Sequence, residues 1–241
     1  MSAIDLRSFY LERYSEVETY LDLLKGLEDE TRHGVPRLAK TGTTISPQQT
    51  KILTSNLYLQ LYNLVEATVT RCLQAITAEI QVQGIAPIEL SLELRREWTR
   101  AVARTHEELG PEKRLKAALK LSDQLVDQLA VAKFEIDPGG GGNWDDKAIE
   151  ELFSRLGAEP IFSADAKTSV KRHVRDDLGS LALVKNRRNG LAHGSLSFVE
   201  CGGEMQYDDM ESLTLAIGKY LDEVVESFVD FIAGDLTAKV C

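Results

Sequence analysis

The chain has 241 residues, a formal net charge of −10 and a sequence pI near 5.0. Its apolar fraction of 43% is too high for a disordered chain, and no apolar run reaches the roughly 18 residues that a membrane span needs. The acidic total argues against broad, non-specific coating of DNA. Six prolines, an aromatic share of 7% and many Leu, Ala, Glu, Gln and Arg favour an all-α fold.

The N-terminus and the cysteines indicate the compartment. Residues 1–7 lack a basic stretch followed by an apolar one, so we expect no signal peptide. Cys72, Cys201 and Cys241 are odd in number, far apart and without a CxxC pair. This pattern argues against a disulfide framework or a cysteine zinc site. We therefore expect a reduced, cytoplasmic protein that does not enter a membrane.

Two long helices are expected first. Apolar residues recur at three- and four-residue steps over residues 4–32, which predicts a helix. Ser46 and Pro47 form a helix start, since serine caps the first turn and proline is accommodated there. The next helix, over about residues 47–82, is apolar around so much of its surface that we expect it to be central. Glu66 lies inside it, and a carboxylate there either finds a partner or lies at the helix edge.

The middle of the chain is divided by glycine and proline. Two helices are expected over residues 88–109 and 111–134, with a break at Gly110 and Pro111. A glycine-rich stretch near residues 138–143 follows. We interpret it as a flexible connector, because no Gly-Lys-Ser/Thr completes a phosphate-binding loop.

Three more helices are predicted after the connector, over residues 145–156, 163–193 and 208–233. Between the last two, residues 195–199 and 203–207 have the pattern of a small β-hairpin. The sequence contains no internal repeat. A single all-α domain over residues 1–241, with the connector inside it, is the simplest account.

Positive charge is concentrated in two segments of this acidic chain. Residues 167–188 carry seven Lys/Arg against two Asp, and local basic faces of this kind are what phosphate contacts need. Residues 95–120 carry eight Lys/Arg against four Glu. We interpret the second segment as a solvated helix face, because long charged faces are usually just that.

One short stretch combines several residues suited to catalysis. Arg187, Arg188, Asn189 and His193 fall within seven residues, next to two glycines. The pattern Arg188-Asn189-x-x-x-His193 resembles the Arg-x4–6-His motif, with Asn after Arg, of the HEPN superfamily of helical domains.

The resemblance extends in order over nearly the whole chain, which is similar to one bacterial branch of stand-alone HEPN-like nucleases. The matching segments are residues 20–24, 59–67, 141–143, 191–198 and the acidic final helix. It implies an all-α HEPN-type bundle of long antiparallel helices and a metal-independent endoribonuclease without a cofactor. It further implies a homodimer with a composite site, and a role as a growth-arresting toxin or phage-defence effector.

The implied chemistry suits these residues. RNA supplies its own nucleophile, the 2′-OH, so no metal-bound water is needed. His193 can move a proton near neutral pH, and Arg188 can hold the charge that develops on the phosphate. Asn189 is expected to orient the imidazole or bind a phosphate oxygen. The products would carry a 2′,3′-cyclic phosphate and a 5′-hydroxyl.

Supporting residues follow from the same resemblance. Glu66 is expected to hydrogen-bond to Arg188 or His193, and Arg187 is either a second cation for the RNA backbone or a solvated surface arginine. Further RNA contacts along the cleft are expected from Lys171, Arg172, Arg175 and Lys185.

A regular helix does not by itself bring Arg188 and His193 together. Asn189 and His193 share a face, whereas Arg188 and His193 are about 140° apart around the axis. They converge if the helix loosens near Gly190 or if Arg188 reaches around, and the resemblance implies that two motifs meet across a dimer cleft. A lone histidine near a helix end can instead be a capping or surface group.

The chain departs from the family pattern at one position, and two alternative functions stay open. Ser195 stands where some HEPN toxins carry a tyrosine that a partner enzyme modifies, so silencing by that route is not supported. An antitoxin or regulatory partner of another kind stays open. His33, His106 and His173 lack metal-site spacing. The alternatives are a non-catalytic helical module that binds RNA, a nucleotide or a protein partner, and a purely structural dimerisation protein.

Overall fold

A computed structural model describes residues 3–104, 108–131, 134–139, 143–234 and 236–238. Within these ranges the chain forms nine α-helices and no β-strand, only isolated bridges. This confirms the all-α prediction. None of the described helices combines the length and the apolar character that a membrane crossing requires.

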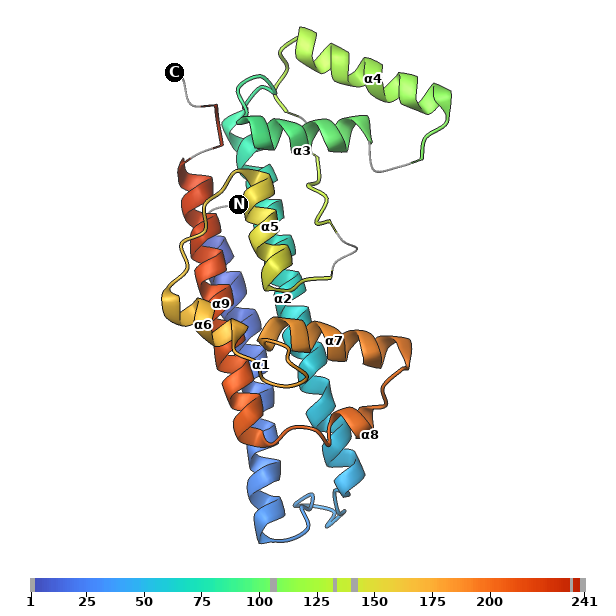
Figure 1. Cartoon of the computed structure of the whole chain (residues 1–241), viewed down its shortest axis with the longest axis vertical. Coiled ribbons are helices and arrows are strands. Elements are labelled where there is room, and N and C mark those ends of the chain that lie inside the picture. The colour runs from blue at the N-terminus through green and yellow to red at the C-terminus, as the bar shows by residue number, and fades with distance from the viewer. Residues whose placement is uncertain (1–2, 105–107, 132–133, 140–142, 235, 239–241) are drawn as a thin grey trace.

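Three long helices form the body of the molecule (Figure 1). They are α1 (Ala3–His33), α2 (Pro47–Gln83) and α9 (Tyr207–Gly234). Helix α1 runs antiparallel to the other two, and all three are in mutual contact. The predicted start of α2 is confirmed, because the Ser46 side chain accepts a hydrogen bond from the Gln49 backbone N–H while the Gln49 side chain caps Ser46 in return.

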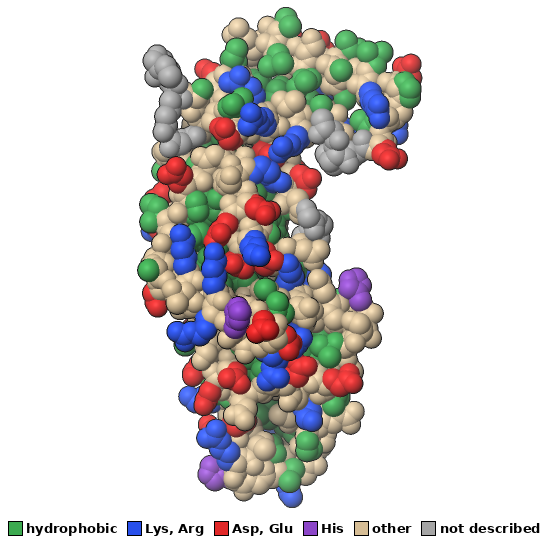
Figure 2. Space-filling model, viewed as in Figure 1, with side chains coloured by type: hydrophobic (Ala, Val, Ile, Leu, Met, Phe, Trp, Pro, Cys, Tyr) green, Lys and Arg blue, Asp and Glu red, His purple; other side chains and the backbone are tan. Residues whose placement is uncertain are grey.

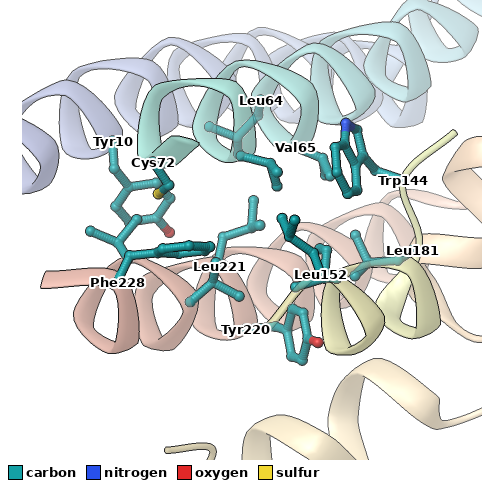
Figure 3. Packing of buried hydrophobic residues seen from close by; sticks show 14 of the residues in the cluster. Tyr10, Leu64, Val65, Cys72, Trp144, Leu152, Leu181, Tyr220, Leu221 and Phe228 are labelled. Atoms are coloured by element: carbon teal, nitrogen blue, oxygen red, sulfur yellow. The ribbon is translucent and has the colours of Figure 1, made fainter. Parts of the chain in front are cut away.

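The core lies where α2 faces α9. Figure 3 shows Leu64, Val65 and Cys72 of α2 opposite Leu221 and Phe228 of α9. All five side chains are at most 1% exposed, which is the close packing expected of a protein interior. Helix α2 also contacts α1, α7 and α8, so the prediction that it is central is confirmed.

Helices α3 (Leu92–Ala103) and α4 (Pro111–Val126) form an arm that extends sideways from one end of the bundle (Figure 1). Both are shorter than predicted. Helix α3 begins later because the Ser91 side chain caps it by accepting from the Leu94 N–H. It ends at Ala103, because the left-handed backbone of the next residue, Arg104 (φ 53°), stops further helical hydrogen bonding. His106 lies outside the described residues, as do residues 140–142 of the predicted connector.

The predicted single helix over 163–193 is wrong. The chain instead forms α6 (Ala164–Lys171) and α7 (Ser180–His193), with a tight loop between them. Asp176 and Asp177 both adopt left-handed backbone (φ 52° and 56°), a conformation that no α-helix can include and that Asp tolerates better than most residues. Helix α5 (Asp146–Leu156) precedes them as predicted.

The predicted hairpin is also wrong, because residues 198–201 form the short helix α8 (Phe198–Cys201). The sequence carries a capping box there: the Ser197 side chain accepts from the Glu200 N–H, and the Glu200 carboxylate accepts from the Ser197 N–H. Gly202 then passes against α2 so closely that an added Cβ would lie 1.7 Å from the Lys51 carbonyl oxygen. Only glycine permits this approach.

Candidate functional site

The candidate catalytic residues lie on α7, which crosses the middle of the bundle. Leu181, Leu183, Val184 and Leu191 are buried and pack the helix against α2 and α9. Helix α7 ends where Gly194 adopts left-handed backbone (φ 72°). The far end of α7 therefore projects from the bundle (Figure 1).

Arg188 is held against α2. Its guanidinium lies over the Tyr62 ring at 4.4 Å from the centroid, and its side chain is about one third exposed. The Glu66 carboxylate lies 3.9 Å from the guanidinium, which is an ion contact rather than a hydrogen bond. Arg188 also donates to the Asn189 side-chain oxygen at 2.8 Å. These contacts orient the cation while leaving part of it open to solvent.

Asn189 is held by the segment that follows the glycine-rich stretch. Its amide donates to the Asn143 side-chain oxygen at 3.2 Å. The next residue, Trp144, is buried, and its backbone N–H donates to the Tyr62 hydroxyl at 3.3 Å. Tyr62 therefore links the 143–144 segment to the guanidinium of Arg188.

The sequence analysis did not assign Tyr62 or Asn143 to the site. The spacing of Tyr62 and Glu66, four residues apart on one helix face, was a signal for Tyr62. For Asn143 the only signal was its position directly after the glycines, because it is 46 positions from Asn189 in the sequence and nothing local indicates the contact.

His193 is the last residue of α7 and is exposed. It makes no hydrogen bond or ion pair within the described residues. Helix α7 is continuous through Gly190, where the following chain folds back: the Leu196 N–H donates to the Gly190 carbonyl at 3.1 Å. The helix does not loosen there. Arg188 and His193 are thus about 140° apart around the axis and about 7.5 Å apart along it.

Arg187 was expected to be either a second cation beside Arg188 or a solvated surface arginine. In the structure it has a different environment. Its side chain is 10% exposed and forms ion pairs with Asp176 (2.5 Å) and Glu204 (2.8 Å). Burial opposes its charge, but the hydrogen bond to Asp176 and the charge of Glu204 raise its pKa above the usual value. Successive residues point about 100° apart on a helix, so Arg187 faces the loop and α8 while Arg188 faces α2.

The basic segment does not form one row along α7. Lys171 lies on α6 and pairs with Glu150 at 2.9 Å. Arg175 lies in the loop and donates to the Glu204 carbonyl, whereas Arg172 is exposed at the end of α6. Only Lys185 shares α7 with the motif.

Lys185 forms an ion pair with Asp145, the residue that caps α5. Burial would raise the pKa of Asp145, but hydrogen bonds from Lys185 and from the Ala148 N–H lower it below the ordinary value. Lys185 is three residues from Arg188 and lies on the same side of α7. It is the one expected RNA contact that the structure brings near Arg188.

The charge pattern offers little for a metal. Among the described residues, no group of three or more His, Cys, Asp or Glu side chains is placed to hold a metal ion. The site instead presents an oriented guanidinium, an amide and an exposed imidazole on one helix.

Comparison with known families covers almost the whole chain. The family model described as HEPN_MAE_28990-like HEPN matches residues 9–236. A search of curated proteins and a search of solved structures each found no match. The matched range contains all of the helices from α2 to α9 and most of α1. The helical bundle and this match together show that the chain belongs to the HEPN superfamily, in the HEPN_MAE_28990-like HEPN family.

Proposed function

We propose that this protein is a metal-independent endoribonuclease that cleaves RNA by attack of the 2′-OH on the neighbouring phosphate. Membership of the HEPN superfamily associates the chain with nuclease-like, RNA-related modules. The observation that carries the finer proposal is the pairing on α7 of a pre-oriented cation, Arg188, with a histidine that has no partner within the described residues.

Each residue has a role that suits its environment. Arg188 is fixed over Tyr62, and its solvent-facing edge can bind two oxygens of a phosphate as five-coordinate charge develops. His193 is exposed and accepts or donates the proton near neutral pH. Asn189 binds a phosphate oxygen or orients the imidazole. Glu66 holds the guanidinium in place without neutralising it fully, since 3.9 Å separates the two groups.

The separation of Arg188 and His193 calls for a second subunit. The two side chains leave α7 in directions about 140° apart, and Arg188 is turned toward α2. Two copies of α7 related by a two-fold axis bring the Arg188 of one subunit toward the His193 of the other. The homodimer that results has a composite site. A role in growth arrest or phage defence, under the control of an antitoxin or another regulatory partner, would suit such an enzyme.

The test is cleavage of mixed tRNA and single-stranded RNA in EDTA. Wild type should cleave and leave 2′,3′-cyclic phosphate ends, and His193→Ala and Arg188→Ala should each lower activity by about 10²-fold or more. His173→Ala is the matched control, because His173 is also exposed but lies in the loop before α7. Cleavage that survives both site substitutions would overturn the proposal.

Mixing the two inactive variants tests the composite site. A heterodimer of His193→Ala with Arg188→Ala has one intact arginine and one intact histidine, so part of the activity should return. The alternative function, a non-catalytic HEPN module that binds RNA, a nucleotide or a protein partner, predicts binding with no turnover. It is favoured if the wild type binds RNA at low salt and never cleaves it.

A further inference from the structure

We propose that the groove between α3, α4 and residues 134–138 is a second RNA-binding site, which holds the phosphate backbone of the substrate at a distance from the catalytic residues. This inference rests on the proposed function, because it takes RNA as the substrate. The groove has a volume of about 1000 Å³.

The α4 wall of the groove is basic. Lys113, Lys116 and Lys120 line it at a spacing that places them on one helix face. All three make no ion pair within the described residues, in a protein whose net charge is −10. Because no carboxylate of the described residues forms an ion pair with them, these three neighbouring lysines create a local positive field on this helix face.

The opposite walls suit the rest of a nucleotide chain. Arg104 contributes a fourth cation, and Ala101 and Val102 supply half-buried apolar surface above the buried Phe134 and Ile136 side chains. Glu135 and Asp137 also line the groove, so the ionised side chains among its described lining residues carry a net charge of +2. The Asp137 carboxylate already accepts a hydrogen bond from the Gly139 N–H at 2.9 Å.

A continuous surface leads from this groove to the candidate catalytic residues. Phe134, Ile136 and Pro138 separate the groove from a second hollow on α2, and they line both. On α2, that second hollow is lined by the uncharged polar residues Thr70, Gln74, Thr77 and Gln81 together with Leu73 and Ala78, and Glu135 lines it from the other side. These residues continue the helix face that carries Tyr62 and Glu66.

The shape of the molecule agrees with this path. Figure 1 shows the α3–α4 arm and the projecting end of α7 on the same side of the bundle, and Figure 2 shows the outline recessed between them. Glu66 and Gln81 are about 22 Å apart along α2 at 1.5 Å per residue. A stacked strand that rises about 3.4 Å per nucleotide needs about seven nucleotides to cover this length.

The test uses the full chain with Lys113→Gln, Lys116→Gln and Lys120→Gln combined. All three side chains are exposed, so the variant should fold, which circular dichroism checks. The matched control replaces Lys25, Arg37 and Lys40 by Gln, which removes the same charge from exposed residues near the other end of the bundle. The probes are fluorescent oligouridylates of about 4 and about 20 nucleotides, shorter and longer than the seven-nucleotide span. Binding is measured by anisotropy in the His193→Ala background.

For the long probe, the groove variant should reduce the slope of log Kd against log salt by about 2, or about 0.7 for each phosphate that a lysine no longer neutralises. When salt rises from about 50 to about 200 mM, the affinity of the protein with the intact groove should therefore fall about 20-fold more than the affinity of the groove variant. The groove variant and the control should cleave the short probe equally in the active protein, because this probe is too short to reach the groove from the catalytic residues. In the active protein, KM for long RNA should rise while kcat stays unchanged, since the lysines lie away from the reacting phosphate.

The two proposals fail separately. If the wild type cleaves RNA but the groove variant and the control give the same salt slope, the second site is refuted and the nuclease stands. If the slope falls as expected but the wild type cleaves nothing, the groove stands and the nuclease is refuted. An equal loss of cleavage of the short probe by the groove variant would also overturn the inference, because it would place the lysines at the catalytic residues.

Discussion

Two neighbouring arginines on α7 should respond to substitution in opposite ways. Arg187 is 10% exposed and joins Asp176 to Glu204, whereas Arg188 is 32% exposed and rests on Tyr62. We predict that Arg187→Gln lowers stability and leaves the catalytic step intact, while Arg188→Gln costs less stability and slows the catalytic step. The comparison is well matched because both changes remove one guanidinium from the same helix.

The magnitudes follow from the contacts. Breaking a fully buried ion pair costs about 3–5 kcal/mol, but Asp176 is 56% exposed and Glu204 26% exposed, so about 2 kcal/mol is expected for Arg187→Gln. Arg188→Gln removes a partly exposed cation–π contact and an ion contact of 3.9 Å, together about 1 kcal/mol. Its cleavage rate should fall by about 10²–10³-fold, as when one charge-stabilising group is removed.

Urea unfolding followed by circular dichroism gives the stabilities, and RNA cleavage well below the unfolding midpoint gives the rates. Wild-type activity with normal stability for Arg188→Gln would remove this residue from the mechanism. Abolished cleavage with unchanged stability for Arg187→Gln would instead show that the reaction uses the buried arginine. Either outcome would refute the division of roles that the ion pairs indicate.

Three further predictions concern the frame around the site. Asp145→Ala removes a helix cap and the partner of Lys185, so it should cost about 1 kcal/mol at pH 7 in urea unfolding. Because the pKa of Asp145 is lowered in the folded chain, this difference should shrink as pH falls below about 4, and a difference that persists there would contradict the assignment. Gly202→Ala should lower the thermal midpoint, since its Cβ would lie 1.7 Å from the Lys51 carbonyl oxygen; an unchanged midpoint would mean that α8 does not pack on α2 this way. Burial and a nearby carboxylate raise the pKa of the Cys201 thiol to about 11, so iodoacetamide at pH 8 should alkylate it far more slowly in the native chain than in urea, as mass spectrometry can show.

Local sequence signals predicted most of the helices because their causes are local. The apolar periodicity of residues 4–32, 47–82 and 208–233 specifies long helices with buried faces, and the structure has them within one or two residues. Ser46 with Pro47 marked the start of α2 through capping chemistry that acts within four residues. Such features need no knowledge of the remainder of the chain.

The predictions were wrong where the sequence pattern continues but a local turn or a contact with a distant part of the chain determines the structure. Val170, Val174 and Leu178 continue the pattern of a helix, yet the chain turns at Asp176, and Arg187 then binds the Asp176 carboxylate from eleven residues away. At residues 195–207 the glycines suggested a hairpin. The Ser197 capping box and the close approach of the following turn to α2 form α8 instead.

The residue types at the candidate site, and their order along one helix, could be identified before any fold was known. Arg188, Asn189 and His193 were found in this way because their spacing is a local property of the chain. The sequence alone does not show that Arg187 faces two carboxylates while Arg188 faces Tyr62. That difference depends on how α7 packs against segments elsewhere in the chain. The same holds for Lys113, Lys116 and Lys120, which face a groove only because a segment beyond their own helix folds back to form the opposite wall.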